Sequence, residues 1–233
     1  MDVRLSEEPI SALAALAQVS IAFSVDRVLD VAEPDATAGP PILRERRLSA
    51  PYVKDYDALP DGGPDSWARR FDVSGWKLIV ARTGDRWVGG AVVARHTPSL
   101  DLLEDRPDLA LLWDIRVTPE LRGTGIGSAL FHGAEALAAA SGCCQLKVET
   151  QNINVPACRL YARCGCVLRG IDPFAYPELP GEVQLLWYKD LAPPSDQSHS
   201  AFMLPYSFRL QHSDRWHPMP PDRPPPGGSH ASP

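Results

Sequence analysis

Residues 109–130 read "LALLWDIRVTPELRGTGIGSAL", an apolar run of strand type followed by a glycine-rich loop and the start of an apolar run of helical type. A loop in this position presents backbone N–H groups that have no partner within the helix. Its glycines let a ligand approach the backbone closely. Because helix starts of this kind bind phosphate groups, the stretch predicts an anion-binding loop.

Two common nucleotide-binding motifs fit this loop poorly. A P-loop requires GxxxxGK followed by Ser or Thr, which does not occur here. A dinucleotide-binding fingerprint requires GxGxxG, whereas these glycines fall at 123, 125 and 127. A purely structural turn between strand and helix also fits the glycines, so the loop alone does not decide its function.

The remaining pattern predicts the fold class. Helices are expected over residues 10–19, 65–71, 124–141 and 154–165. Strands are expected over 21–31, the first part of 42–57, 109–117, 144–151, 166–171 and 183–189, with a hairpin over 76–96 around Thr83, Gly84 and Asp85. Strands therefore come first as a hairpin and then alternate with helices. This order predicts an α+β (mixed α/β) fold built on a mixed β-sheet.

Composition divides the chain into two parts. The chain has 233 residues, of which 44% are hydrophobic, and this is enough for a full core. We expect the folded domain over residues 1–192. Residues 193–233 hold ten of the 24 prolines and four of the six histidines, which predicts a disordered Pro-rich tail. Within it, "AFMLPYSFRL" (201–210) is apolar enough to be a docking segment for a partner.

Charge and cysteine usage exclude several classes of protein. A net charge of -6 argues against a nucleic-acid partner and mildly favours a cationic one. The first twenty residues are acidic where a signal peptide is basic, and their apolar stretch is too short to span a membrane. The five cysteines lack paired CxxC spacing, so we expect reduced, mostly buried thiols, no metal site and a cytoplasmic location. The oligomeric state is not determined by these features, and a homodimer is one of the states that they leave open.

Two spacings carry a resemblance to a known family. The loop "RGTGIG" (122–127) resembles the (Gln/Arg)-x-x-Gly-x-(Gly/Ala) loop of the GNAT superfamily of N-acetyltransferases. Downstream, "NVPACRLY" (154–161) resembles that family's N-x-x-A-x-x-x-Y motif, on the helix that follows the next strand. The two motifs occur in the family's order. The resemblance implies a central, mostly antiparallel sheet flanked by helices.

Within that superfamily the chain most resembles the streptothricin acetyltransferases, which acetylate the β-lysine amine of a cationic antibiotic. The likeness lies in residues 149–177, in "SAPYVKDYD" (49–57) and in "EVQLLWYK" (182–189). Three features depart from the family: Cys166 stands where an aromatic residue is usual, residues 96–110 are an insertion, and the Pro-rich tail has no counterpart.

The resemblance implies acetyl-CoA as the co-substrate. The loop would hold its pyrophosphate, and the strand before the loop would separate from its neighbour so that free amides receive the pantetheine arm. Asn154 would cap its helix and contact the same arm. The implied acetyl-CoA site consists of Ile115, Arg116, Val117, Arg122, Gly123, Thr124, Gly125, Ile126, Gly127 and Asn154.

Amine acetylation also requires proton transfer. An alkyl ammonium with a pKa near 10 is only about one part in a thousand neutral at pH 7, so a base must take a proton. Asp114 alternates with core residues and can face a cleft, and Glu149 ends the next strand. Either carboxylate could accept the proton or attract the cation, and Asp114 could instead form a salt bridge with Arg116 or Arg122. By resemblance, Tyr161 would protonate the departing thiolate.

The identity of the amine acceptor is the part of the function that the sequence determines least. Asp55, Tyr56 and Glu182 lie in the stretches that resemble the antibiotic acetyltransferases and are candidate cleft residues. We expect an N-acetyltransferase that acts on a small cationic amine such as streptothricin. A peptide N-terminus of the ribosomal-protein type is the alternative acceptor, and a non-catalytic CoA-binding domain with a docking tail is the alternative of a different class.

Overall fold

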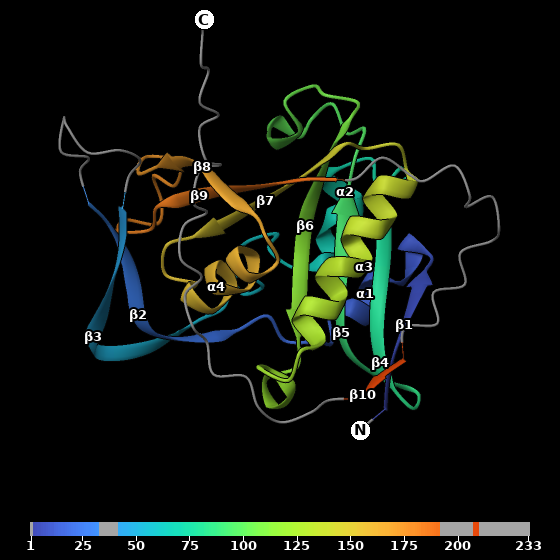
Figure 1. Ribbon diagram of the computed structural model, residues 1–233, viewed down its shortest axis with the longest axis horizontal. Coiled ribbons are helices and arrows are strands. Elements are labelled where there is room, and N and C mark those ends of the chain that lie inside the picture. The colour runs from blue at the N-terminus through green and yellow to red at the C-terminus, as the bar shows by residue number, and fades with distance from the viewer. Residues whose placement is uncertain (1, 33–41, 192–206, 210–233) are drawn as a thin grey trace, which may run out of the picture.

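The computed structural model describes residues 2–32, 42–191 and 207–209. An eight-stranded sheet has the strand order β10-β1-β4-β5-β6-β7-β9-β8, and β2 and β3 form a separate ribbon (Figure 1). The strands of the large sheet are β1 (Asp2–Glu8), β4 (Lys77–Thr83), β5 (Arg86–Ala94), β6 (Leu109–Val117), β7 (Gln145–Gln151), β8 (Val167–Asp172), β9 (Gln184–Asp190) and β10 (Ser207–Arg209). The pair β6 and β7 is parallel, and the other described pairs are antiparallel. The α+β fold with a mixed, mostly antiparallel sheet is confirmed.

The N-terminal region differs from the sequence prediction. Residues 2–8 form strand β1, which pairs with β4, where no strand was expected. The signal is short but present, because buried Val3 and Leu5 alternate with exposed residues. The helix expected over 10–19 is shorter: a 3-10 turn, η1 (Ile10–Ala12), leads into α1 (Leu13–Leu16).

The hairpin of β4 and β5 is confirmed. Its turn consists of Gly84 and Asp85, and Gly84 has a φ of +57°, a left-handed conformation that glycine adopts without steric cost. Both strands are buried along most of their length. The hairpin therefore forms the centre of the sheet, and β6 adds to its β5 side.

Helices cover the two faces of the sheet differently. Helix α3 (Ile126–Ala140) lies on one face and buries Leu130 and Phe131 against β4, β5 and β6 (Figure 1). Helices α1 and α2 (Pro64–Arg70) lie on the other face, over a second apolar cluster. This second cluster is rich in aromatic rings, namely Trp67, Phe71, Trp76 and Trp113.

The insertion at residues 96–110 is part of the folded domain. It contains a 3-10 turn, η2 (Asp101–Leu103), and runs into the start of β6. Trp76 Nε1 donates a hydrogen bond of 2.8 Å to Thr97 Oγ1, and Lys147, whose side chain is 3% exposed, pairs with Glu104 at 2.7 Å. These contacts attach the insertion to β7 and to the aromatic cluster.

The ribbon of β2 (Phe23–Ala32) and β3 (Ile42–Lys54) lies beyond helix α4 (Val155–Arg163) in Figure 1. Phe23, Val25 and Val28 pack against Ile153, just ahead of α4. The strand expected at the start of residues 42–57 continues to Lys54, so the loop begins later than the sequence pattern indicates. Residues 49–54 lie in β3 of this ribbon, and residues 55–57 follow it toward the large sheet.

Most of the expected tail lies outside the described residues. Its described part, Ser207–Arg209, forms β10 and pairs antiparallel with β1, so the disorder predicted for the tail is wrong at these three residues. The docking segment and the boundary after residue 192 therefore stay predictions. The five cysteines are free, and four of them are buried, as expected. In the described parts of the chain, no helix is long and apolar enough to cross a membrane.

Candidate active site

The site begins where two neighbouring strands part. Strands β6 and β7 are paired only from Leu109 with Gln145 to Leu112 with Val148. Beyond that point β6 continues beside β5 and β7 continues beside β9. The backbone of residues 113–117 therefore has no strand partner on its β7 side in the described sheet. The separation expected between these strands is confirmed.

A β-bulge lies at the same point. On β5, Val92 pairs with Asp114 and Val93 pairs with Leu112, so Trp113 is the extra residue. Trp113 packs in the aromatic cluster under α2, on the same face as Val92. The bulge thus turns Asp114 toward the α1 and α2 face as well. Ile115, by contrast, packs with the core under α3, as does Val117.

The glycine-rich loop presents backbone toward the cleft. Gly123 and Gly125 have φ values of +77° and +96°, and Gly125 precedes α3 without any side-chain cap. The first N–H groups of α3 are therefore available to an anion. The side chains point elsewhere, because Thr124 Oγ1 donates to Leu121 O at 2.6 Å and Ile126 is buried in the core.

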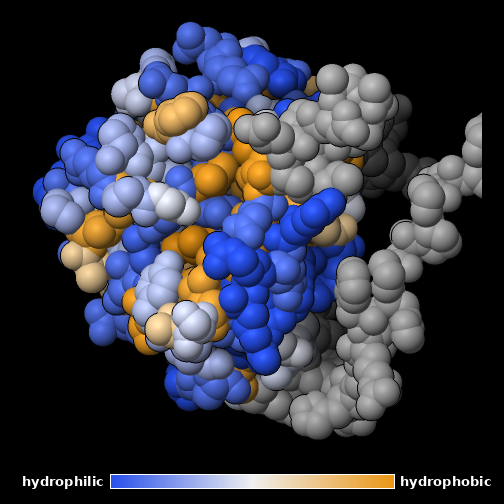
Figure 2. Space-filling view, turned by 90° about the vertical axis from the view of Figure 1, so that its left-hand side faces the viewer, coloured by the Kyte–Doolittle hydropathy of each residue, from blue (hydrophilic) through white to orange (hydrophobic). Residues whose placement is uncertain are grey.

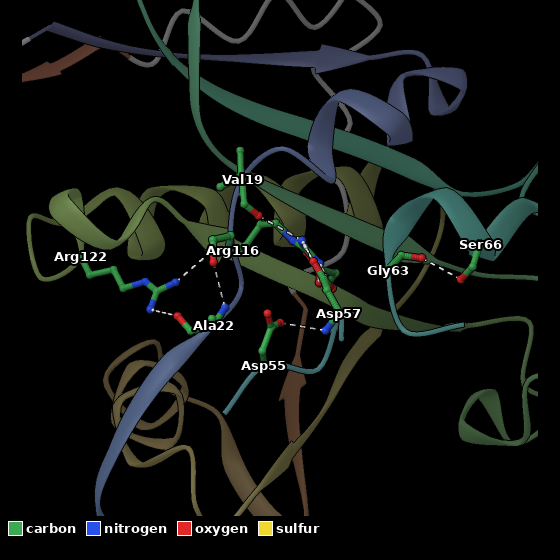
Figure 3. A network of polar contacts seen from close by, with 10 residues as sticks. Val19, Ala22, Asp55, Asp57, Gly63, Ser66, Arg116 and Arg122 are labelled. Carbon is green, nitrogen blue, oxygen red and sulfur yellow. Dashed lines mark hydrogen bonds and ion pairs between the residues drawn. The ribbon is translucent and has the colours of Figure 1, made fainter. Parts of the chain in front are cut away.

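Arg122 fastens this loop to the chain ahead of β2. Its guanidinium donates to the carbonyl oxygens of Val117 at 2.9 Å, Ala22 at 2.6 Å and Ser20 at 2.9 Å (Figure 3). The side chain is thus committed to backbone carbonyls. In this arrangement the loop's amides face the cleft, and the basic side chains of Arg159 and Arg163 also line it.

A single cleft of about 1470 Å³ contains these features. It extends from the start of α3 and from α4, past the gap between β6 and β7, to Tyr56 and α2. In Figure 2, apolar side chains lie in hollows between hydrophilic rims. Three carboxylates line the cleft, those of Asp57, Asp114 and Glu149.

Asp114 is committed to an ion pair. Arg116 Nε and Nη2 donate to its two carboxylate oxygens at 2.8 and 2.7 Å. Arg116 also donates to Asp57 at 2.7 and 3.2 Å and to Val19 O at 3.1 Å. The pairing of Asp114 with an arginine, one of the three roles that the sequence leaves open, is the arrangement found. Arg116 contributes its side chain to this network and only its backbone to the gap.

Glu149 has a different partner. It alternates along β7 with the buried core residues Leu146 and Val148, so it faces the same side of the sheet as Asp114. The Tyr176 hydroxyl donates to its carboxylate, and Gln151 Nε2 donates to that hydroxyl at 3.1 Å. Burial and the Glu149 charge raise the pKa of Tyr176, so it stays a proton donor.

Tyr161 approaches the gap from the opposite face. It lies on α4 between Phe131 and Trp187, with ring centroids 6.1 and 6.5 Å away, and it is 4% exposed. Burial raises the pKa of Tyr161 well above its ordinary value, and the charge of Asp114 acts in the same direction. The hydroxyl is therefore protonated throughout the neutral range.

At the start of the same helix, Asn154 caps α4 by accepting from Ala157 N at 3.3 Å, and it lines the cleft.

The three candidate acceptor residues have different surroundings. Tyr56 lines the cleft, and its hydroxyl donates to Glu182 at 2.6 Å. Glu182 is buried and also pairs with Lys54, outside the described lining. Asp55 turns back to accept from Asp57 N at 3.0 Å, and it too lies outside that lining (Figure 3).

The sequence pattern did not identify two residues of the site: Asp57, which lines the cleft, and Tyr176, which lies outside that lining but donates to the cleft residue Glu149. Both lie in the stretches that resemble the antibiotic acetyltransferases, but nothing local separates Asp57 from its neighbour Asp55. Their roles depend on partners distant in the chain, Arg116 and Glu149 respectively. Among the described residues, no group of three or more His, Cys, Asp and Glu could hold a metal ion.

A sequence profile of the acetyltransferase (GNAT) family matches residues 43–166. The chain belongs to the GNAT acetyltransferase family. The streptothricin acetyltransferase A of Bacillus subtilis is 37% identical over 146 residues, covering 62% of this chain and 76% of its own length. The streptothricin acetyltransferase of Escherichia coli is 31% identical over 145 residues, covering 61% and 72%.

Solved structures agree with this membership. A nourseothricin acetyltransferase is 27% identical with a TM-score of 0.61, covering 82% of this chain and 99% of its own. A Bacillus anthracis protein assigned as a streptothricin acetyltransferase, solved in complex with acetyl coenzyme A, has a TM-score of 0.64 and 22% identity over 82% and 100% of the two chains. Because its sequence identity is only 22%, the likeness to the Bacillus anthracis protein supports the fold alone.

The conformation of Gly125 generates a prediction. An alanine at a positive φ costs about 1–2 kcal/mol, so Gly125→Ala should strain the loop and move its amides. Gly142→Ala is the matched control, because Gly142 has a φ of +83° in an open turn after α3, away from the cleft. Both variants should lose similar stability in urea denaturation. By calorimetry, only Gly125→Ala should weaken acetyl-CoA binding, by about tenfold or more. Equal affinities in the two variants would exclude the loop from the site.

Proposed function

We propose that this acetyltransferase transfers the acetyl group of acetyl-CoA to a primary amine of a small cationic acceptor, streptothricin or a closely similar molecule. The observation that carries the proposal is the acidic side of the cleft, where Asp57, Asp114 and Glu149 face one opening. Several carboxylates favour a multiply cationic guest. The relatives named streptothricin acetyltransferase support the same acceptor class.

The described residues fit the acetyl donor. The amides at the start of α3 are open to the pyrophosphate, and the unpaired edge of β6 is open to the pantetheine arm. Arg163 and Arg159 line the same side of the cleft, where Arg159 is paired with Glu45. When bound, acetyl-CoA supplies the activated acetyl thioester, whose carbonyl the β6 amides would polarise.

We assign the base role to Glu149. Asp114 accepts two hydrogen bonds from Arg116 at 2.8 and 2.7 Å, and its side chain is only 4% exposed, so it is poorly placed to take a proton from an acceptor. Glu149 lines the cleft at the gap and receives the Tyr176 hydroxyl, which an incoming ammonium can replace as donor. Glu149 would take the proton directly or through water.

We assign the acid role to Tyr161. Its raised pKa keeps the phenol protonated, and its place on the α3 face lets it reach the gap from the side opposite the carboxylates. In this arrangement the amine attacks the thioester from the face of the carboxylates. The departing thiolate is then accessible to Tyr161 from the other face. The phenol proton would then neutralise that thiolate as it departs. A cytoplasmic location, consistent with five free cysteines, belongs to the same proposal.

A competition assay tests the acceptor. Streptothricin and a ribosomal-type peptide that begins with Ala are offered at equal concentration with acetyl-CoA, and the products are identified by mass. The peptide is chosen so that its α-amine is its only positive charge. We expect the antibiotic to be acetylated faster, because the acidic cleft favours the multiply cationic acceptor. Preferential acetylation of the peptide's α-amine would contradict the acceptor assignment and would support a peptide acetyltransferase instead.

The acid role gives a second prediction. Tyr161→Phe keeps the ring in its packing but removes the proton, so kcat should fall by about 10²-fold or more. The Kd for acetyl-CoA should barely change, because the hydroxyl is needed only as the thiolate forms. Steady-state kinetics and calorimetry measure the two quantities. A similar loss in both would indicate that the tyrosine only packs.

A further inference from the structure

The network around Arg116 is the most highly charged buried feature beside the cleft. All five N–H groups of this guanidinium are used: two donate to Asp114, two to Asp57 and one to Val19 O (Figure 3). The Arg116 side chain is 0% exposed, that of Asp114 4% and that of Asp57 23%. Asp57 is thus the member of the network that stays open to the cleft.

The charges of this network do not cancel. Two carboxylates face one guanidinium, which leaves one negative charge at the cleft wall. Arg116 has no remaining donor, so the wall cannot bind an anion through it. The Asp57 oxygens each accept one hydrogen bond from Arg116 and keep lone pairs for a further donor. Such a carboxylate, fixed in place and partly open, suits an ammonium group.

Asp57 and Glu149 lie on different walls. Asp57 follows β3 and is held against β6, whereas Glu149 lies on β7, across the gap. An amine that attacks the thioester must first lose its proton, so it cannot also remain the cation that Asp57 holds. Two ammonium groups of one acceptor would satisfy both carboxylates.

We propose that Asp57 binds a second, non-reacting ammonium group of the acceptor, with Arg116 as its positioning residue. The inference rests on the proposed function, since it concerns the acceptor of the same reaction. It makes the enzyme selective for diamines over monoamines. It also implies that Asp114 neutralises the positive charge of Arg116 and does not transfer a proton.

Two matched acceptors test this selectivity: 3,6-diaminohexanamide and 3-aminohexanamide, which differ only in the terminal amine. Streptothricin serves as the reference acceptor. Wild type should prefer the diamine in kcat/KM by about tenfold or more, as expected for a charge-assisted contact. Asp57→Asn keeps an oxygen for Arg116 but loses the charge. This variant should raise KM for the diamine and for streptothricin about tenfold, while kcat and the monoamine rate change little.

Salt and a control variant separate binding from folding. In wild type, KM for the diamine should rise with ionic strength, and in Asp57→Asn this dependence should become weaker, because Glu149 still carries a charge at the cleft. Asp61→Asn is the control, because Asp61 lies exposed in the same loop at a φ of +55°, which asparagine tolerates. Its diamine preference should match that of wild type.

Three results would overturn the proposal. Retained diamine preference in Asp57→Asn would refute the second ammonium site and leave the proposed function intact. Equal losses on both amines, with a lower Tm and weaker acetyl-CoA binding, would show that Asp57 only holds its loop in place. Failure of wild type to acetylate streptothricin or either amine would refute the proposed function and this inference together.

Discussion

The structure of the site depends on the parting of β6 from β7 after Leu112 and Val148. In a continuous sheet the backbone of residues 113–117 would be paired on both sides, and the two faces would be sealed from each other. The gap instead leaves one edge of β6 unpaired. It also joins the face that holds Tyr161 to the face that holds Glu149, so the two groups that we propose for proton transfer can serve one reacting centre between them.

Several contacts stabilise this parting. Trp113, the bulged residue, is held by edge contacts to Phe71 and Trp67, with ring centroids 5.3 and 5.9 Å away. Arg116 and Arg122 then attach the separated end of β6 to the segment between α1 and β2. On the other side, β7 gains β9 as its partner. The ends of both strands are thus fixed by contacts that do not bridge the gap.

Local sequence signals predicted the parts of the site that depend on neighbouring residues. The glycines of the loop and the Asn154 cap act within a few positions, so their spacing identifies them. The Asp114 and Arg116 pair is nearly as local, yet the role of Asp114 stayed open, because strand alternation alone does not show which group its carboxylate contacts. Asp57 reaches Arg116 across 59 positions, and Tyr176 reaches Glu149 across 27. No local pattern encodes such contacts, and strand β1 was missed because its alternation is short.

Hydrogen exchange of the full chain, followed by mass spectrometry with and without acetyl-CoA, tests the central role of the gap most directly. If the unpaired edge of β6 and the loop before α3 receive the donor, peptides that cover residues 113–127 will exchange more slowly when acetyl-CoA is present. The turn of the β4 and β5 hairpin at Gly84 should exchange at an unchanged rate. Unchanged exchange over 113–127 at saturating acetyl-CoA would contradict the account.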